Sequence, residues 1–185
     1  MDKYPEIEKI YNDIKDLNIQ GATNVAIATF EGMKLYEDIS KQKDKELFYK
    51  EFFEVGDRLS HARTNEPFAT NGVKYVKYLF NKKFSVLPEL ATMKRELAQL
   101  CDDYLNIIGQ SKKDLIDKSW KFFNNYNKVF THCHSSTAVS LIKSISKNKP
   151  NFEVVCTETR PKLQGRITAK SLLEARIKTT LIADS

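Results

Sequence analysis

The chain has 185 residues and a net charge of +6, with 41% hydrophobic and 29% charged residues. Six glycines and five prolines are too few for a disordered or low-complexity protein, so a globular chain of one domain, or one domain plus part of another, is predicted. No apolar run approaches the roughly 18 residues that span a bilayer, and the charged N-terminus lacks the apolar stretch of a signal peptide. The three widely spaced cysteines form neither a disulfide framework nor a zinc pair, so a cytoplasmic protein is expected.

The positive charge is concentrated in the last third of the chain. Residues 1–125 contain 20 basic and 20 acidic side chains, whereas residues 126–185 contain ten basic and four acidic ones. Such an excess can drive nucleic-acid binding by counterion release, but these basic residues lack the interleaved aromatic residues of a single-strand binder. A local phosphate ligand or a solvated surface accounts for them as well, so nucleic acid is the less favoured partner.

Apolar residues at three- and four-residue steps predict six helices in the first part of the chain. A turn is expected at residues 64–67, with Pro67 suited to the first turn of the following helix, and Ser111 is expected to cap a separate last helix. These patterns predict a helical N-terminal domain over residues 1–125. Its helices are expected at residues 3–18, 22–39, 43–59, 67–80, 87–107 and 111–123.

The pattern changes after residue 125. Three β-prone segments, at 128–133, 152–157 and 179–183, alternate with helices expected to begin near residues 135–137 and at Thr168. Short connections of this kind imply right-handed crossovers and a parallel sheet. Three strands leave the last edge open. The predicted fold class is α/β: a helical domain followed, over residues 126–185, by an incomplete Rossmann-like three-layer domain with three parallel strands.

In an open α/β sheet, ligands bind beyond the carboxyl ends of the strands, where helix N-termini present unpaired N–H groups. The first two predicted strands end in residues 132–136 (HCHSS) and 157–160 (TETR). Ser135 supplies a hydroxyl, and Arg160 a guanidinium suited to a bidentate phosphate contact. Gly165 would let the backbone approach a ligand closely. The sequence therefore predicts one anion-binding crevice shared by the two segments.

The residues alone are compatible with two roles for Cys133. A helix N-terminus just after it would favour the reactive thiolate, whereas an isolated cysteine at a strand end can equally be a small buried apolar residue. His132 and His134 flank it, but further zinc ligands cannot be recognised, so no metal is expected. The chain also lacks a nucleophile elbow, a P-loop and a GxGxxG motif, and no cofactor is predicted.

Three segments resemble consecutive blocks of one protein family: residues 131–137 (THCHSST), 157–170 (TETRPKLQGRITAK) and 180–185 (TLIADS). In the helical half, residues 20–22 (QGA) resemble the family's Arg-Gly-Ala, and residues 62–72 resemble its "ARPTEP…NG" stretch. The family includes archaeal ribose-1,5-bisphosphate isomerase, methylthioribose-1-phosphate isomerase, and the alpha, beta and delta subunits of translation initiation factor 2B. The Cys-His-Ser version is similar to the archaeal isomerase-like branch.

The resemblance implies a function and a set of site residues. Cys133 matches the isomerases' catalytic cysteine, the acid/base partner that moves a proton as the sugar opens to a ketose. The implied activity is aldose–ketose isomerisation of the ribose-1,5-bisphosphate to ribulose-1,5-bisphosphate type, with a phosphorylated ribose or a nucleotide as ligand. Phosphate and ribose contacts would come from Gly21, Ala22, Arg63, Ser135, Arg160 and Gln164.

Two departures from the family pattern qualify that expectation. Gln20 replaces the arginine of Arg-Gly-Ala, which removes a charge-assisted contact worth roughly 1.5–3 kcal/mol. The family's catalytic aspartate, in a Gly-Ala-Asp motif, and its NKIGT stretch follow the last residue given, and Asp184 belongs to the third-strand block. Because acid–base chemistry uses both groups, the chain by itself is not expected to be a competent isomerase.

Two alternatives stay open. One is a non-catalytic regulatory subunit of the initiation factor 2B type, which would bind a nucleotide or sugar phosphate in the same crevice. The other is a decayed fragment without activity. In each case the open third strand predicts association, either as a homo-oligomer or with a partner chain that completes the sheet.

Overall fold

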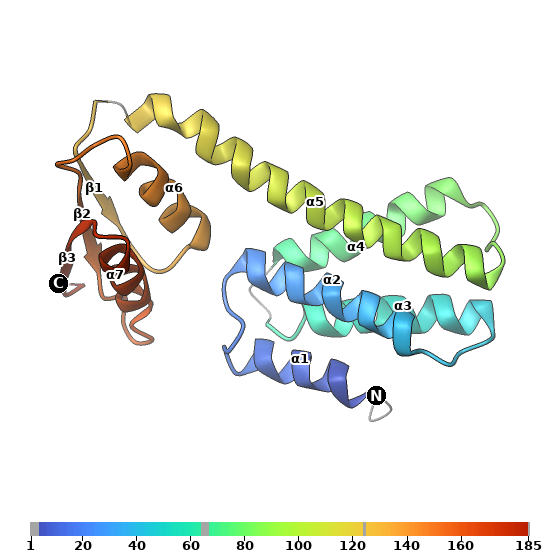
Figure 1. The fold of residues 1–185 in the computed structure, drawn as a ribbon. Helices are drawn as coiled ribbons and strands as arrows, with labels where there is room; N and C mark the ends of the chain where they lie inside the picture. Colours follow the sequence, from blue (N-terminus) through green and yellow to red (C-terminus); the bar gives the residue numbers. More distant parts are fainter. Residues whose placement is uncertain (1–3, 64–66, 124, 185) are drawn as a thin grey trace. The chain divides into compact units, whose positions relative to one another are not determined.

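A computed structural model describes residues 4–63, 67–123 and 125–184 (Figure 1). The chain divides into two compact units, residues 1–109 and 110–185, which are considered separately below. Among the described residues, no helix combines the length and apolar character needed to traverse a bilayer.

The first unit is entirely helical. Asp44 caps the third helix, because its carboxylate accepts hydrogen bonds from the N–H groups of Glu46 and Leu47. Pro67 is the first residue of the fourth helix, as predicted, whereas residues 64–66 of the predicted turn lie outside the described residues. The helices of this unit are α1 (Pro5–Lys15), α2 (Ala22–Ile39), α3 (Lys45–Ser60), α4 (Pro67–Lys83) and the first part of α5 (Leu90–Phe123).

The core of the first unit is rich in aromatic side chains. Tyr36 of α2 packs against Phe48 and Phe52 of α3 with ring centroids 5.5 and 6.4 Å apart, and all three residues are fully buried. The Tyr36 hydroxyl donates a 2.5 Å hydrogen bond to Glu51, and burial raises the pKa of this phenol. The periodic apolar residues of the sequence thus meet in two buried clusters of the helical unit, which confirms the predicted helical half.

Helix α5 corrects one prediction. A separate helix was expected to begin at Ser111, but α5 continues without a break from Leu90 to Phe123. A serine or glycine inside a helix costs about 0.5–1 kcal/mol, whereas a break leaves backbone groups unpaired at two new ends. Gly109 and Ser111 are therefore retained inside the helix. The domain ranges 1–125 and 126–185 stay a prediction.

The second unit contains a parallel sheet of three strands in the order β1-β2-β3. Its elements after α5 are β1 (Lys128–Thr131), α6 (Ser136–Ser146), β2 (Glu153–Thr157), α7 (Gln164–Glu174) and β3 (Lys178–Ile182). Val129, Val154 and side chains of both helices share one core, so α6 and α7 cover the same face of the sheet. The predicted α/β fold with three parallel strands is confirmed.

The start of α7 corrects a second prediction. Thr168 was expected to cap this helix, but α7 begins at Gln164, and Thr168 lies in its second turn, where its hydroxyl donates to the carbonyl of Cys133. The Glu158 carbonyl accepts from the N–H of Gly165 and takes the place of a side-chain cap. A Cβ on Gly165 would lie 1.6 Å from the carbonyl oxygen of Thr157, so only glycine permits this packing.

Two helical glycines should respond in opposite ways to alanine. Gly165→Ala is expected to lower the free energy of unfolding by about 3 kcal/mol, because backbone atoms of β2 must move. Gly109→Ala, in open space on α5, is expected to raise it by up to about 1 kcal/mol. Urea unfolding followed by circular dichroism measures both, and a destabilised Gly109→Ala would contradict the continuous helix.

Candidate functional site

The segments that follow β1 and β2 meet at the carboxyl end of the sheet. The N–H of Cys133 donates a 2.9 Å hydrogen bond to the Thr159 hydroxyl, and His132 Nδ1 lies 2.6 Å from the Thr157 hydroxyl. His134 Nδ1 lies 2.9 Å from the Thr168 hydroxyl, and burial lowers the pKa of this imidazole. The turn that carries Cys133 is therefore held by side chains of the next strand, loop and helix.

Cys133 is placed differently from the other two cysteines. Its backbone has a φ of 65°, its side chain is half-buried, and its Sγ lies 3.4 Å from the Gln164 amide oxygen. Cys101 and Cys156 are fully buried, and burial raises the pKa of both thiols, that of Cys101 to about 12. A left-handed backbone at a non-glycine residue is a strained conformation that concentrates at functional sites. The thiol of Cys133 thus has the access that a reacting group needs.

Ser135 and Arg160 both lie at this carboxyl end, but each already has a structural contact. The Ser135 hydroxyl caps α6 by accepting from the N–H of Ala138 at 3.3 Å. Arg160 follows β2, and its Nε lies 2.5 Å from a carboxylate oxygen of Glu158. Its side chain is 72% exposed, so its outer N–H groups face solvent.

The carboxyl end carries a balanced set of side-chain charges. Glu158 pairs with Arg160 and, at 3.0 Å, with Arg166, and these hydrogen bonds lower the pKa of the carboxyl. Asp184, after β3, accepts from the N–H groups of Arg160 and Thr159 at 2.5 and 2.8 Å, which lowers its pKa as well. The side-chain charges of these four residues therefore cancel, and the N-termini of α6 and α7 supply the remaining positive bias of this end. The anion-binding crevice expected from the sequence stays a prediction.

From the sequence alone, three residues of this cluster had no assigned role in the candidate site: Thr159, Thr168 and Asp184. The rule that parallel strands end together places Asp184 at the carboxyl end, because it follows β3. The same rule places Thr159, within residues 157–160, at this end. The contacts of Thr159 and Thr168 with Cys133 could not be predicted, since they depend on the loop conformation. Among the described residues, no group of three His, Cys, Asp or Glu side chains is placed to hold a metal ion.

The remaining predicted contacts lie in the first unit. Gly21 has a φ of 88° and is the N-cap of α2, where Ala22 is the first helical residue. Arg63 follows α3, and its neighbour Ala62 packs in the cluster that contains Val25. The structure thus gathers Cys133, Ser135, Arg160 and Gln164 in one unit and places Gly21, Ala22 and Arg63 in the other. That all seven form one site stays a prediction.

The topology is that of an open α/β protein, a class in which ligands bind beyond the carboxyl ends of parallel strands. The chain belongs to the Initiation factor 2 subunit family, whose model matches residues 18–185. This finding confirms the resemblance on which the predicted site residues rest.

Curated relatives include sugar-phosphate isomerases. The chain is 32% identical over 183 residues to ribose 1,5-bisphosphate isomerase of Methanocaldococcus jannaschii, covering 97% of this chain and 56% of the relative. It is 29% identical over 199 residues to methylthioribose-1-phosphate isomerase of Thermoanaerobacter pseudethanolicus, covering 96% and 54%. The chain therefore resembles sugar-phosphate isomerases, and it spans about half the length of the curated relatives it matches.

Two solved structures share the fold. Translation initiation factor eIF-2B of Pyrococcus horikoshii superposes with a TM-score of 0.80 at 19% identity, covering 96% of this chain and 59% of that one. The 5-methylthioribose 1-phosphate isomerase of the same organism gives a TM-score of 0.77 at 23% identity, covering 96% and 52%. These likenesses confirm the architecture of both units.

Cys133 is expected to react with iodoacetamide faster than Cys101 and Cys156 near neutral pH. The physical reason is exposure, because the other two thiols are buried and held protonated. Peptide mass spectrometry after timed alkylation measures the three rates, and Cys133→Ser should remove the fast phase. Equal, slow alkylation of all three would place Cys133 in the core.

Proposed function

We propose that this chain supplies the cysteine-bearing part of a sugar-phosphate aldose–ketose isomerase site, of the ribose-1,5-bisphosphate to ribulose-1,5-bisphosphate type. The observation that carries the proposal is the strained, half-buried Cys133 at the carboxyl end of the sheet, beside Gln164. The isomerase relatives support it through similarity that extends over nearly the whole chain. The substrate and the activity belong to proteins about twice this length and are proposed, not observed, for this chain.

The proposed chemistry is proton transfer without net oxidation. Aldose–ketose conversion moves hydrogen from one sugar carbon to its neighbour and needs an acid and a base on the two sides of that step. Cys133 supplies one of these groups, and the Gln164 amide is placed to orient the thiol or a sugar hydroxyl. The second acid–base group implied by the family resemblance is the aspartate of the Gly-Ala-Asp motif, and this motif is not among the 185 residues. Ligand binding without turnover is therefore expected of the 185-residue chain.

Phosphate binding at this end requires Arg160. In the structure its guanidinium pairs with Glu158, and a ligand phosphate would add to that pair at the exposed N–H groups or replace the carboxylate. The Glu158–Arg166 contact can keep the carboxylate charge paired after such an exchange. Arg166 thus serves as a second partner that lets Arg160 turn to the ligand.

The regulatory alternative shares this ligand site. Its supporting observation is the similarity of fold to the eIF-2B of Pyrococcus horikoshii, with a TM-score of 0.80. A protein of this kind would bind a nucleotide or sugar phosphate and leave it unchanged. A larger thermal shift with a nucleoside monophosphate than with the sugar bisphosphate would favour this alternative.

Ribose-1,5-bisphosphate should raise the melting temperature of the chain, and Arg160→Ala should abolish the shift. Lys170→Ala is the control, because it removes an exposed cation of the following helix, α7, that lies outside the proposed phosphate contacts. Differential scanning fluorimetry measures the shift, and the same samples are assayed for ribulose-1,5-bisphosphate. Equal shifts in the wild type and Arg160→Ala would remove Arg160 from the site.

We also propose that the outer face of the sheet, away from α6 and α7, pairs with a second copy of the chain. Phe130 of β1 is 64% exposed and Ile182 of β3 is 42% exposed, and the register aligns Phe130 with Val155 and Thr180 across the strands. Exposed apolar patches of this kind mark interaction surfaces. A tetrameric eIF2B complex of Chaetomium thermophilum shares the fold, with a TM-score of 0.72.

Phe130→Glu is expected to weaken self-association at least tenfold, because it places a charge in the buried apolar contact. Phe122→Glu is the control, since Phe122 is similarly exposed, at 68%, but lies on α5. Sedimentation velocity over a concentration series measures the effect. A wild-type chain that stays monomeric throughout would rule out the second copy and leave a different partner chain as the occupant.

A further inference from the structure

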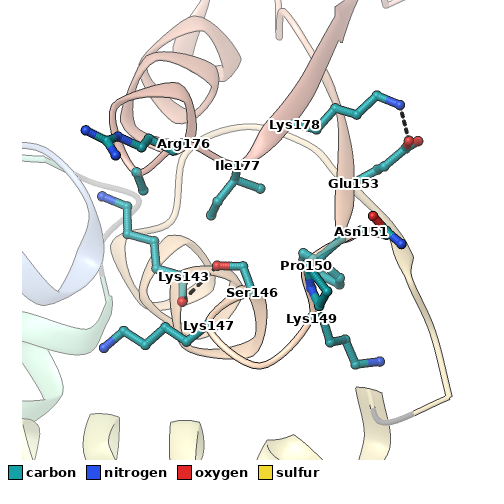
Figure 2. A pocket seen from close by; sticks show the side chains of 12 residues that line it. Lys143, Ser146, Lys147, Lys149, Pro150, Asn151, Glu153, Arg176, Ile177 and Lys178 are labelled. Carbon is teal, nitrogen blue, oxygen red and sulfur yellow. Dashed lines mark hydrogen bonds and ion pairs between the residues drawn. The ribbon is translucent and has the colours of Figure 1, made fainter.

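Five of the ten basic residues in 126–185 gather at the opposite, amino end of the sheet. A pocket of about 630 Å³ opens there between the ends of α6 and α7 and the starts of β2 and β3. Figure 2 shows Arg176, Lys143 and Lys147 along one side of it and the Lys178–Glu153 ion pair across from them. We name it the amino-end pocket. Its charged lining residues are Lys143, Lys147, Lys149, Glu153, Arg176 and Lys178.

The charges of this pocket do not balance. Five cations face one carboxylate, and Glu153 is shared with Lys128 outside the pocket. The C-terminal ends of α6 and α7 contribute together about one further negative charge through their dipoles. Roughly three positive charges remain, whereas the same count at the carboxyl end, where α6 and α7 begin, leaves about one. If these cations served only to offset the helix dipoles, the pocket would not have so large an excess of positive charge.

Some of these cations have structural partners and others do not. Lys149 donates to the backbone carbonyls of Phe123 and Tyr126, and Lys143 donates to the Ser171 hydroxyl. Within residues 4–63, 67–123 and 125–184, the structure records no ion pair or hydrogen bond from the Lys147 or Arg176 side chains. These two exposed cations are the groups available to a ligand.

Arg176 also occupies an unusual backbone position. The N–H of Arg176 bonds to the carbonyl of Leu173 and that of Ile177 to Leu172, which is the Schellman pattern at a helix end. The residue at this position adopts a left-handed conformation, here with a φ of 59°, and is usually glycine. An arginine at this position strains the backbone, and a strained residue of this kind motivates a functional hypothesis for its side chain.

We propose that the amino-end pocket binds a small ligand that carries two or more phosphate groups. One phosphate would not neutralise the charge excess, and the guanidinium of Arg176 matches phosphate oxygens in a bidentate manner. The volume lies within the range of about 300–1,000 Å³ typical of small-molecule sites. Nucleic acid fits this site less well. The cations line a pocket and do not form an extended stripe along the surface. Phe152, the aromatic residue of the lining, is buried in the core and cannot stack with a base.

The test uses inorganic pyrophosphate as the probe and the 185-residue chain as the protein. Isothermal titration at moderate salt is expected to show one site per chain, with orthophosphate binding more weakly. Arg176→Gly and Lys147→Ala should each weaken pyrophosphate binding about ten- to hundredfold, because each removes a charge-assisted contact. Lys170→Ala, which removes an exposed cation from α7 outside the pocket, should leave it within about twofold.

Arg176→Gly separates binding from folding. Glycine suits the left-handed position, so the melting temperature of this variant without ligand should be unchanged or higher by up to about 4 °C, even though pyrophosphate binding is weakened. Arg160→Ala should keep full pyrophosphate binding, which distinguishes this pocket from the proposed sugar-phosphate site.

Several outcomes would overturn the proposal. The wild type could fail to bind pyrophosphate. Alternatively, the control Lys170→Ala could weaken binding as much as Arg176→Gly and Lys147→Ala do, which would show that the effect does not depend on the pocket. Loss in Arg160→Ala alone would assign the ligand to the carboxyl end. Binding of a single-stranded RNA with a steep salt dependence, without pyrophosphate binding at the same salt, would identify the surface as a nucleic-acid contact.

Discussion

The close packing of Gly165 against the end of β2 is the constraint on which the carboxyl end depends. Because Gly165 has no side chain, α7 begins directly behind Thr157, and the Glu158 carbonyl accepts the N–H of Gly165. This early start brings Gln164 beside the Cys133 thiol and places Thr168 in the second turn, where its hydroxyl reaches the Cys133 carbonyl. A helix that began at Thr168, as the sequence indicated, would provide neither contact. The local geometry around the cysteine is thus a consequence of one missing Cβ.

Most element boundaries follow from local residue chemistry, and the sequence predicted those well. Asp44 and Ser135 cap their helices through side-chain oxygens, and Pro67 opens α4, because these residues favour such positions irrespective of the rest of the fold. Ser111 and Thr168 also resemble caps, yet both lie inside helices. Their positions are decided by helix continuity and by tertiary packing at Gly165, which local preferences do not contain. Prediction therefore failed at residues that favour a helix start but are placed inside a helix by helix continuity or by tertiary packing.

In the candidate site, too, some features could be predicted from the sequence and others depended on tertiary contacts. Parallel topology was enough to predict that Cys133, Ser135 and Arg160 share one end of the sheet. It could not predict that Glu158 would pair with both Arg160 and Arg166, nor that Asp184 would bind the loop backbone. The net charge of the last third indicated an anion site but not its location. The unbalanced part of the charge lies at the amino end. Of the four carboxylates in residues 126–185, Glu158 and Asp184 lie at the carboxyl end, and Glu153 is the carboxylate that lines the amino-end pocket.

This distribution has a consequence for recognition. At the carboxyl end, the side-chain charges cancel and the helix N-termini leave a small positive bias, so phosphate binding there depends mainly on hydrogen-bond geometry and on exchange of Arg160 away from Glu158. At the amino end, the field itself attracts anions, and selectivity has to come from the shape of the pocket and from Arg176. A sugar phosphate with several hydroxyl groups suits the first environment, because its hydroxyls use the neutral donors and acceptors around Cys133 and Gln164. A compact, highly charged ligand suits the second, so the two ends of one small sheet are suited to different phosphates.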